Sequence, residues 1–428
     1  MSGRGRRLRR AAGGPAESEL GGCFMASYTM IPVEQAAAII LDHTEPLATE
    51  RLPASAAFGR VLARAVHAAQ PMPPFDASTV DGYAVLAEDP NPRRKVLAII
   101  TAGRPVETAV ETGTAIRIMT GAPLPPGADA VIMQEFTRED DGHVVLERGV
   151  RPGENVNRLG RDIADGQVVL EPGTALGPAE LGLLASLGIG AVEVYRRPHV
   201  AVLSTGDELV EADQEAPYGA IRDSNRPSLM AAIREAGGEP ISLGIARDDE
   251  DTQRRLVRQG LDEADVLVTS GGVSVGTRDL IKPLLEEVGT VYFGQVALKP
   301  GKPLTFAKVG PKAAFGLPGN PVSSLVSFEV FVRPALRKMQ GYTRLHRPTV
   351  EVTLDHDVRK TPDRTEYQRA TVVWRPDGLV ARTTGSQSSS RLLSMVGANA
   401  LLHIPPGEGT LAAGTRVQAL LVGELVVE

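Results

Sequence analysis

Three segments of the chain place an apolar run of strand composition directly before a loop of small and polar residues, and a helical pattern follows each loop. The runs and their loops are 200–203 with Ser-Thr-Gly-Asp-Glu at 204–208, 266–269 with Ser-Gly-Gly-Val-Ser-Val-Gly at 270–276, and 313–317 with Pro-Gly-Asn-Pro at 318–321. In an open parallel sheet such loops line one crevice at the carboxyl ends of the strands, where glycine lets a ligand approach the backbone and helix N-termini favour anions. The sequence therefore predicts a binding site for a phosphorylated ligand.

A second candidate site lies in the segment 73–84, which reads Pro-Pro-Phe-Asp-Ala-Ser-Thr-Val-Asp-Gly-Tyr-Ala. Its rigid entry and the glycine after Asp81 can fix a carboxylate to hold a metal or to act as a general base. Taken alone, the motif favours the alternative that Asp76 and Asp81 form Asx turns that close the loop. A strand-like stretch ending at Thr120 and Gly121 suits an oxyanion contact, but it is also an ordinary strand end.

The sequence Lys-Pro-Gly-Lys-Pro at 299–303 is more specific. Its two prolines stiffen the backbone, so Lys299 and Lys302 present two ammonium groups with little loss of entropy, which suits an oxyanion of charge −2. The alternative is two solvated lysines on a turn. The loop 270–276 lacks the Lys-Ser/Thr ending of a Walker loop, and His356 between two aspartates is more typical of a solvated strand end than of a metal ligand.

Charge and cysteine usage exclude several classes of protein. The chain of 428 residues has a net charge of −6, and residues 1–30 hold five arginines against two glutamates, which leaves 41 basic and 50 acidic residues in the rest. This negative body argues against nucleic-acid binding. We expect a disordered basic tail over 1–30, no signal peptide, no membrane association and a cytoplasmic protein. Because the single cysteine, Cys23, lies in that tail, neither disulfides nor a cysteine metal site can hold the fold.

The periodicity along the chain predicts an α/β region accompanied by β-rich domains. Apolar spacing predicts a helix from about residue 31 and a second short helix near 54–62, and the run 322–336 is apolar nearly all round, as in a buried helix. The expected units are a linker and helical domain at 31–67 and 166–197, whose first helix packs on the α/β domain, a β-rich domain at 68–165, an α/β domain with a parallel sheet at 198–346 and a small β-barrel at 347–428.

In this order, six of these motifs resemble the molybdopterin molybdenumtransferase (MoeA) family, whose relatives include the E domains of gephyrin and of the plant molybdenum cofactor biosynthesis protein. The matching residues are 74–76, 78 and 81–84, then 117–122, 204–209, 270–276, 299–303 and 317–321, whereas Ala77 stands where the family often has asparagine. The resemblance implies an elongated homodimer of four-domain subunits with a molybdopterin-binding type of α/β domain. It further implies that adenylylated molybdopterin binds there, that molybdate is inserted into its dithiolene, and that AMP is released with help from Mg²⁺ or another divalent cation.

The resemblance also assigns roles by position. Asp81 matches the essential acid of the family, Thr120 and Glu208 match further active-site positions, and Asp81 with Glu208 are the candidate metal ligands. The positions expected to bind substrate are Ser270, Gly271, Gly272, Ser274, Gly276, Lys299, Lys302, Pro318, Gly319, Asn320, Arg369 and Ser389. The last two match the molybdate site of the plant relative more loosely, because three consecutive serines at 388–390 allow a shift of one residue.

Two other functions fit parts of the sequence. A non-catalytic scaffold is one, since the E domain of gephyrin also clusters receptors, but the presence of Asp81, Thr120 and both lysines argues against lost chemistry. The other is the enzyme that adenylylates molybdopterin, whose fold resembles 198–346 alone, so that the additional β-rich domains favour the insertion step. That adenylyltransferase and the molybdoenzymes that accept the product are expected as partners.

Overall fold

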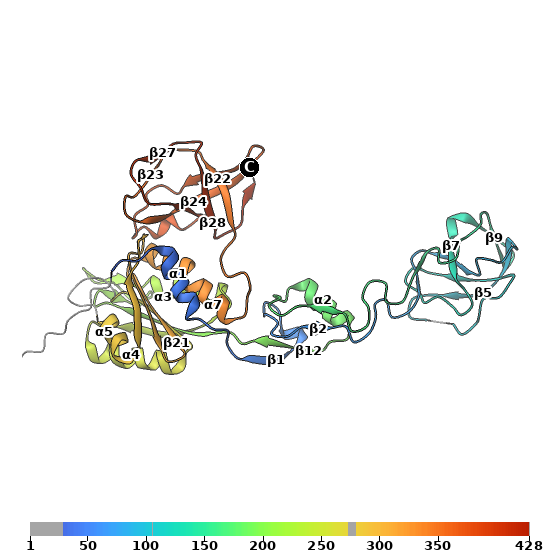
Figure 1. Cartoon of the computed structure of the whole chain (residues 1–428), viewed down its shortest axis with the longest axis horizontal. Coiled ribbons are helices and arrows are strands. Elements are labelled where there is room, and N and C mark those ends of the chain that lie inside the picture. The colour runs from blue at the N-terminus through green and yellow to red at the C-terminus, as the bar shows by residue number, and fades with distance from the viewer. Residues whose placement is uncertain (1–28, 105, 273–279, 428) are drawn as a thin grey trace, which may run out of the picture.

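The structure of the chain is a computed structural model that describes residues 29–104, 106–272 and 280–427. Ser274 and Gly276, the basic tail through residue 28 and Cys23 lie outside the described residues. Figure 1 shows an elongated subunit with an α/β domain and a barrel stacked at one end and a β-rich domain at the other, joined by a thin linker. None of the helices in the described part of the chain has the length and apolar character to cross a lipid bilayer.

A six-stranded sheet forms the centre of the α/β domain, in the order β16-β13-β17-β21-β20-β18. The strands are β13 (His199–Thr205), β16 (Glu239–Ala246), β17 (Val266–Ser270), β18 (Thr290–Gln295), β20 (Pro303–Val309) and β21 (Lys312–Leu317). The first four in the sheet are parallel, and β20 runs antiparallel to both of its neighbours, β21 and β18. Ser204 lies opposite Ser270, and Ser270 lies opposite Leu317, so the three predicted loops leave the sheet at one level.

Helices cover both faces of this sheet because successive residues of each strand point to opposite faces. Val200 and Val202 pack on the side that carries α1 (Val33–Asp42), α3 (Asn225–Glu235), α6 (Pro321–Ser327) and α7 (Arg333–Met339). Ala201 and Leu203 pack on the other side against α4 (Glu250–Glu263) and α5 (Ile281–Val288). The first helix therefore does pack on the α/β domain. The buried run after Asn320 is helical as predicted, with a π-helical turn, η3 (Phe328–Val332), between α6 and α7.

The linker consists of short antiparallel pairs and one helix. Strand β1 (Thr49–Pro53) pairs with β12 (Ala191–Tyr195), β2 (Val66–His67) pairs with β11 (Val168–Leu170), and α2 (Pro178–Ser186) packs beside them. The prediction of a second helix near 54–62 is wrong, because the structure has only the short 3₁₀ turn η1 (Ala54–Ala56) in this described segment. Val61 and Leu62 instead form bridges to Ala175 and Val194, because tertiary pairing overrides weak local helix propensity here.

The β-rich domain contains a sheet in the order β7-β4-β6-β5-β9-β8 and a separate short pair, β3 with β10. The strands are β3 (Ala77–Ser78), β4 (Gly82–Val85), β5 (Arg93–Ile100), β6 (Thr114–Ile118), β7 (Ala130–Met133), β8 (Thr137–Asp140), β9 (His143–Leu146) and β10 (Val156–Asn157), with the turn η2 (Gln134–Phe136). Strand β4 begins at Gly82, where an added Cβ would lie 1.9 Å from the carbonyl oxygen of Ile132. Only glycine fits this approach, which explains the glycine after Asp81.

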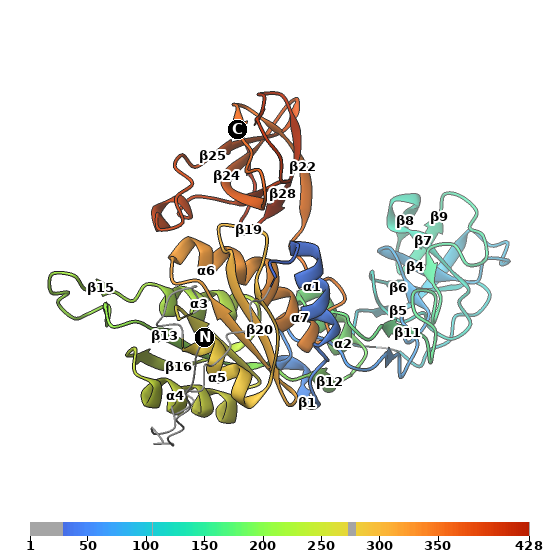
Figure 2. The same cartoon turned by 60° about the vertical axis from the view of Figure 1, so that its left-hand side comes forward.

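The C-terminal region is a closed barrel in which β24, β25, β22, β28 and β26 pair in a ring. Its elements are β22 (Thr349–Leu354), β23 (Val358–Arg359), β24 (Thr365–Arg375), β25 (Gly378–Thr383), η4 (Leu392–Ser394), β26 (Ala400–Ile404), β27 (Thr410–Leu411), β28 (Arg416–Leu421) and β29 (Val426–Val427). Strand β19 (Leu298–Lys299), which lies in the Lys-Pro-Gly-Lys-Pro segment, pairs with β24. The lysine segment thus joins the α/β domain to the barrel, as Figure 2 shows.

Candidate active site

The three strand-end loops of the central sheet meet at one place. Asn225, which begins α3, donates through Nδ2 to Ser270 Oγ at 2.6 Å and to the carbonyl oxygen of Gly319 at 2.7 Å. The two remaining short strands of the domain, β14 (Leu209–Val210) and β15 (Ile221–Arg222), form an arm next to these loops. The structure therefore brings together Ser270 of the second loop and Gly319 of the third, through an asparagine that the sequence analysis did not select.

Glycines let the first and second loops approach each other closely. Gly271 has a φ of +90°, and an added Cβ there would lie 2.6 Å from the carbonyl oxygen of Thr205. Gly206 has a φ of +148°, and a Cβ there would lie 2.6 Å from a carboxylate oxygen of Glu208. Side chains would be strained in this conformation and would fill the space over the backbone. Glu208 itself is exposed at this edge, so an acid stands beside the loops.

The two lysines of the 299–303 segment differ in their surroundings. Lys299 Nζ donates to Thr361 Oγ1 at 3.0 Å and lies 3.3 Å from Glu366 Oε1, so it is already paired with residues of the barrel. Lys302 is exposed, and its ammonium group has no partner within the described part of the chain. A pocket of about 520 Å³ opens beside Lys299, with further cationic groups from Arg359 and Lys360 on its wall.

The barrel contributes the two residues that matched the molybdate site of the plant relative. Ser389 accepts a hydrogen bond from Asn320 Nδ2 at 3.1 Å, and its carbonyl accepts from the backbone N–H of Val322. Arg369 is fully buried, where it donates to Ser394 Oγ and to the carbonyl of Ser388, whereas its buried Nη1 has no hydrogen-bond partner in the described part of the chain. Burial lowers the pKa of Arg369 to about 10. Ser389 thus lies at the third loop, and Arg369 lies behind the serine segment.

Asp81 and Thr120 form a second constellation in the β-rich domain. The backbone N–H and the hydroxyl of Thr120 donate to Asp81 Oδ1 at 2.7 and 2.8 Å. These hydrogen bonds hold the pKa of Asp81 below its usual range, and the backbone N–H of Thr120 makes the largest contribution. This exposed carboxylate is therefore ionised at neutral pH. Its Oδ2 has no hydrogen-bond partner among the described residues.

A single chain does not unite the two constellations. Asp81 directly precedes β4 in the domain at one end of Figure 1, whereas Glu208 follows β13 at the other end. A cation therefore cannot bind both acids of one subunit. Within 29–104, 106–272 and 280–427, no three His, Cys, Asp or Glu side chains gather into a metal site.

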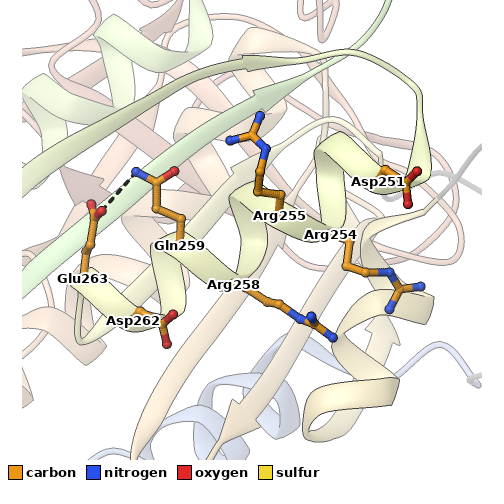
Figure 3. Close-up of a pocket in the computed structure, with 7 residues that line it drawn as sticks. All are labelled: Asp251, Arg254, Arg255, Arg258, Gln259, Asp262 and Glu263. Carbon is orange, nitrogen blue, oxygen red and sulfur yellow. Dashed lines mark hydrogen bonds between the residues drawn. The ribbon is translucent and has the colours of Figure 1, made fainter.

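Another pocket, of about 430 Å³, lies on the outer face of α4. Figure 3 shows that all of its lining side chains come from this one helix, and that Gln259 donates to Glu263 across it. Helix α4 covers the face of the sheet opposite α3, and the pocket contains none of the strand-end residues. We therefore assign the active site to the loops and not to this pocket.

Two residues of the site escaped the sequence analysis. Asn225 stands in the run Ser-Asn-Arg-Pro at the start of a helix, where asparagine is common because its side chain caps backbone N–H groups. Glu366 lies in a barrel strand, and no signal connects it to Lys299 before the register of β19 with β24 is known.

Comparison with known proteins supports this geometry. Three family descriptions match in order: the MoeA N-terminal region (domain I and II) at 31–188, a probable molybdopterin binding domain at 201–338 and the MoeA C-terminal region (domain IV) at 351–422. A molybdopterin molybdenumtransferase of Haemophilus influenzae is 37% identical over 91% of this chain and 98% of its own length. Gephyrin of Dictyostelium discoideum is also 37% identical, over 94% of this chain, but this chain spans only 63% of its length.

A solved structure agrees over nearly the whole chain. The crystal structure of the molybdopterin biosynthesis MoeA protein from Pyrococcus horikoshii is similar with a TM-score of 0.80 and 33% identity, and covers 92% of this chain and 100% of that one. The chain belongs to the MoeA family.

Proposed function

We propose that this chain is a molybdopterin molybdenumtransferase, which inserts molybdate into adenylylated molybdopterin, releases AMP and so gives the molybdenum-loaded cofactor. The observation that carries the proposal is the meeting of the strand-end loops around Asn225, with Ser389 of the barrel bonded to Asn320 of the third loop. Glycine backbone and strand ends suit the phosphates of the adenylylated ligand. The names of the relatives support the same activity.

The oxyanion is proposed to bind near the lysine segment. Molybdate is a dianion, and charge-assisted hydrogen bonds from ammonium and guanidinium groups are the strongest that a protein offers it. Lys302, whose exposed ammonium group has no partner among the described residues, is the first candidate contact, and Lys299, Arg369 and Ser389 are the further candidates. The side chain of Asn320 orients Ser389 at the point where the third loop meets the barrel.

The acids are assigned to a divalent cation and to water. Asp81 Oδ2, which accepts no hydrogen bond from the described residues, is the kind of oxygen ligand that Mg²⁺ prefers, and Thr120 fixes the other oxygen of the same carboxylate. A bound cation would polarise the phosphoanhydride whose cleavage accompanies insertion. Glu208 is the second acid of this proposal, and it stands beside the loop at Gly206.

The active site is proposed to form between two copies of the chain. Since Asp81 and Glu208 lie at opposite ends of one subunit, the β-rich domain of one protomer would have to meet the α/β domain of its partner. A homodimer with such a site should bury more than the roughly 2,000 Å² where obligate interfaces begin. Exposed apolar side chains such as Phe58, Phe75 and Leu159 are available for burial. A cytoplasmic protein that takes its substrate from the adenylyltransferase and passes its product to molybdoenzymes completes the proposal.

One assay tests the activity. Purified protein is incubated with adenylylated molybdopterin and a Mg²⁺ salt, with and without molybdate, and AMP is quantified by mass spectrometry. A molybdenumtransferase releases AMP only when molybdate is present. A scaffold releases none under either condition, and the adenylyltransferase of the preceding step would instead make the adenylylated compound in a parallel incubation with molybdopterin and ATP. Either of the last two results would overturn the proposal.

A further inference from the structure

The oxyanion site of the proposed function contains a buried carboxylate. The side chain of Glu366 is only 3% exposed, yet its Oε1 lies 3.3 Å from Lys299 Nζ. Its Oε2 accepts a hydrogen bond from Thr361 Oγ1 at 2.8 Å, and the same hydroxyl accepts from Lys299 Nζ at 3.0 Å. The three groups therefore form a closed ring of hydrogen bonds between the barrel and the lysine segment.

The backbone fixes this ring. Lys299 and Glu366 are direct register partners in the pairing of β19 with β24, so the ring recurs whenever the two strands pair. The charge of Glu366 also acts on the second cation of the site, because it opposes the effect of burial on the pKa of Arg369. One carboxylate thus pairs with Lys299 and interacts electrostatically with Arg369, two of the cations that the proposed function assigns to the oxyanion.

A carboxylate is unexpected in a site for a dianion because like charges repel at short range. A buried Glu366 without a partner would be costly, so in the free protein it needs Lys299 and Thr361. When an oxyanion approaches, it competes with Glu366 for the same ammonium group. The cluster of Lys299, Arg369 and Glu366 then offers a net charge of +1 in place of +2, which weakens binding and favours release.

We propose that Glu366 is the resident counter-ion of the oxyanion site, a positioning residue that holds Lys299 in place and that molybdate must displace from its ammonium group. This inference rests on the proposed function, and it adds a residue that sets affinity and not one that contacts the reacting atoms. A purely structural Glu366 would make the opposite prediction, because its loss would misplace Lys299 and weaken molybdate binding.

The test is the equilibrium affinity of the full-length protein for sodium molybdate alone, measured by isothermal titration calorimetry. Glu366→Gln should bind molybdate about tenfold more tightly, which corresponds to about 1.4 kcal/mol. Glu366→Asp keeps the charge and should stay within about threefold of the wild type, about 0.7 kcal/mol on the same scale. Glu351→Gln removes one negative charge from the exposed face of the same barrel, where Glu351 pairs with Arg416, and should change nothing.

The outcomes separate the two proposals. Weaker or unchanged binding by Glu366→Gln, while Lys299→Ala still binds more weakly than the wild type, would overturn the counter-ion role alone. Equal tightening by Glu366→Gln and Glu366→Asp would also overturn it, because geometry and not charge would then set the affinity. Wild-type affinity in Lys299→Ala would move the oxyanion away from this segment and overturn both the assigned site and the counter-ion.

Discussion

Asp81 shows how a single residue can be fixed for chemistry with little burial. Gly82 admits only hydrogen as a side chain because β4 approaches Ile132 closely, and Thr120 donates twice to one oxygen of the carboxylate. The side chain therefore points in one direction while its second oxygen stays open. The Asx-turn alternative would have used the carboxylate within its own loop, whereas both donors belong to the end of a neighbouring strand.

Changing Asp81 to Asn should separate binding from catalysis. The substitution keeps the size of the side chain but removes the charge needed to hold a cation or to activate water, so AMP release should slow by at least roughly a hundredfold. Binding of adenylylated molybdopterin should remain, since the proposed phosphate contacts lie on the strand-end loops. Single-turnover AMP release and equilibrium binding of the same ligand are the measurements.

Asp140→Asn is the matched control, because Asp140 is an acid of the same domain that pairs with Arg93 away from Thr120. Near-wild-type release by Asp81→Asn would reduce Asp81 to a loop-closing role. Parallel loss of release and binding would make its role structural.

Lys302 contributes little to the structure of the free protein, because its ammonium group is exposed and has no partner among the described residues. Lys302→Ala should weaken apparent molybdate affinity by roughly 1.5 to 3 kcal/mol, the range for a charge-assisted hydrogen bond. Arg255→Ala removes an equal charge from the exposed face of α4 and should leave that affinity unchanged. The molybdate dependence of AMP release measures both, and an unchanged dependence in Lys302→Ala would shift the oxyanion toward Arg369 and Ser389.

At the scale of elements, the start of α3 is hydrogen-bonded to the loops that follow two strands. Asn225 Nδ2 donates to Ser270 and to the carbonyl of Gly319, and it reinforces the contact between the second and third loops that the hydrogen bond from the Gly271 N–H to the Leu317 carbonyl also makes. Asn225→Asp is nearly isosteric but places an acceptor against the Gly319 carbonyl. Loss of the hydrogen bond to an acceptor of this kind costs about 1–3 kcal/mol.

The Asn225→Asp protein should therefore bind adenylylated molybdopterin at least about tenfold more weakly. Its circular dichroism spectrum should match that of the wild type, because the helix itself is retained. An unchanged dissociation constant would mean that the loops keep their positions without the hydrogen bonds of Asn225.

The junction between the linker and the sheet depends on an ion pair. Arg196 donates to both oxygens of Asp265 at 2.7 and 2.6 Å, and the N–H of His199 adds a third hydrogen bond. Burial raises the pKa of Asp265. The hydrogen bonds and the positive charge of Arg196 lower the pKa by more than burial raises it, so the pKa lies below the usual value. The charged form is therefore favoured in the folded protein.

This pair predicts a stability that depends on pH. Because the pKa of Asp265 is depressed on folding, its contribution is complete above the usual aspartate value of 3.8 and is lost as the pH falls below it. Asp265→Asn should cost about 1–2 kcal/mol at pH 7, a value reduced for the partial exposure of Arg196. Urea unfolding at pH 7 and near pH 3 measures it, and the difference between variant and wild type should shrink at the lower pH. A constant difference would contradict the assignment.

At the scale of the whole molecule, distance between domains is the central fact. Figures 1 and 2 both place the domain of β4 far from the strand ends of β13, β17 and β21. An enzyme that needs Asp81 beside the phosphates must therefore obtain one of the two from another chain. Light scattering at working concentration should report a dimer, and a monomer there would contradict the shared site.

Mixed dimers give the sharper test. Asp81→Asn and Lys302→Ala each damage one half of the shared site, so a dimer that contains one subunit of each keeps one site with both residues intact. At limiting molybdate the mixed dimer should recover about half of the wild-type rate, since a two-fold dimer has two equivalent sites. If each chain held a complete site of its own, both subunits would remain defective and mixing would restore nothing.

The sequence by itself determined the parts whose signals are local. Apolar runs before glycine-rich loops gave β13, β17 and β21 to within a residue or two, because strands of a parallel sheet buried on both faces need continuous apolar residues. Six motifs in order were enough to predict the family, the type of fold and the chemistry. The glycines at 82 and 271 are part of motifs that the sequence displays. The reason that no other residue fits there, a close approach of another backbone segment, is visible only in three dimensions.

Tertiary structure decided everything that depends on which distant segments meet. The pairing of Lys299 with Glu366 comes from the register of two strands whose paired residues are 67 positions apart in the chain, and no local pattern encodes it. The contact of Asn320 with Ser389 and the full burial of Arg369 arise in the same way, from the docking of the barrel on the α/β domain. The short helix predicted near 54–62 failed for the same reason, because bridges to distant residues outweighed local propensity. Local propensities contribute tenths of a kcal/mol per residue, whereas burial and pairing between distant segments contribute several, so contacts remote in sequence decide where the site lies.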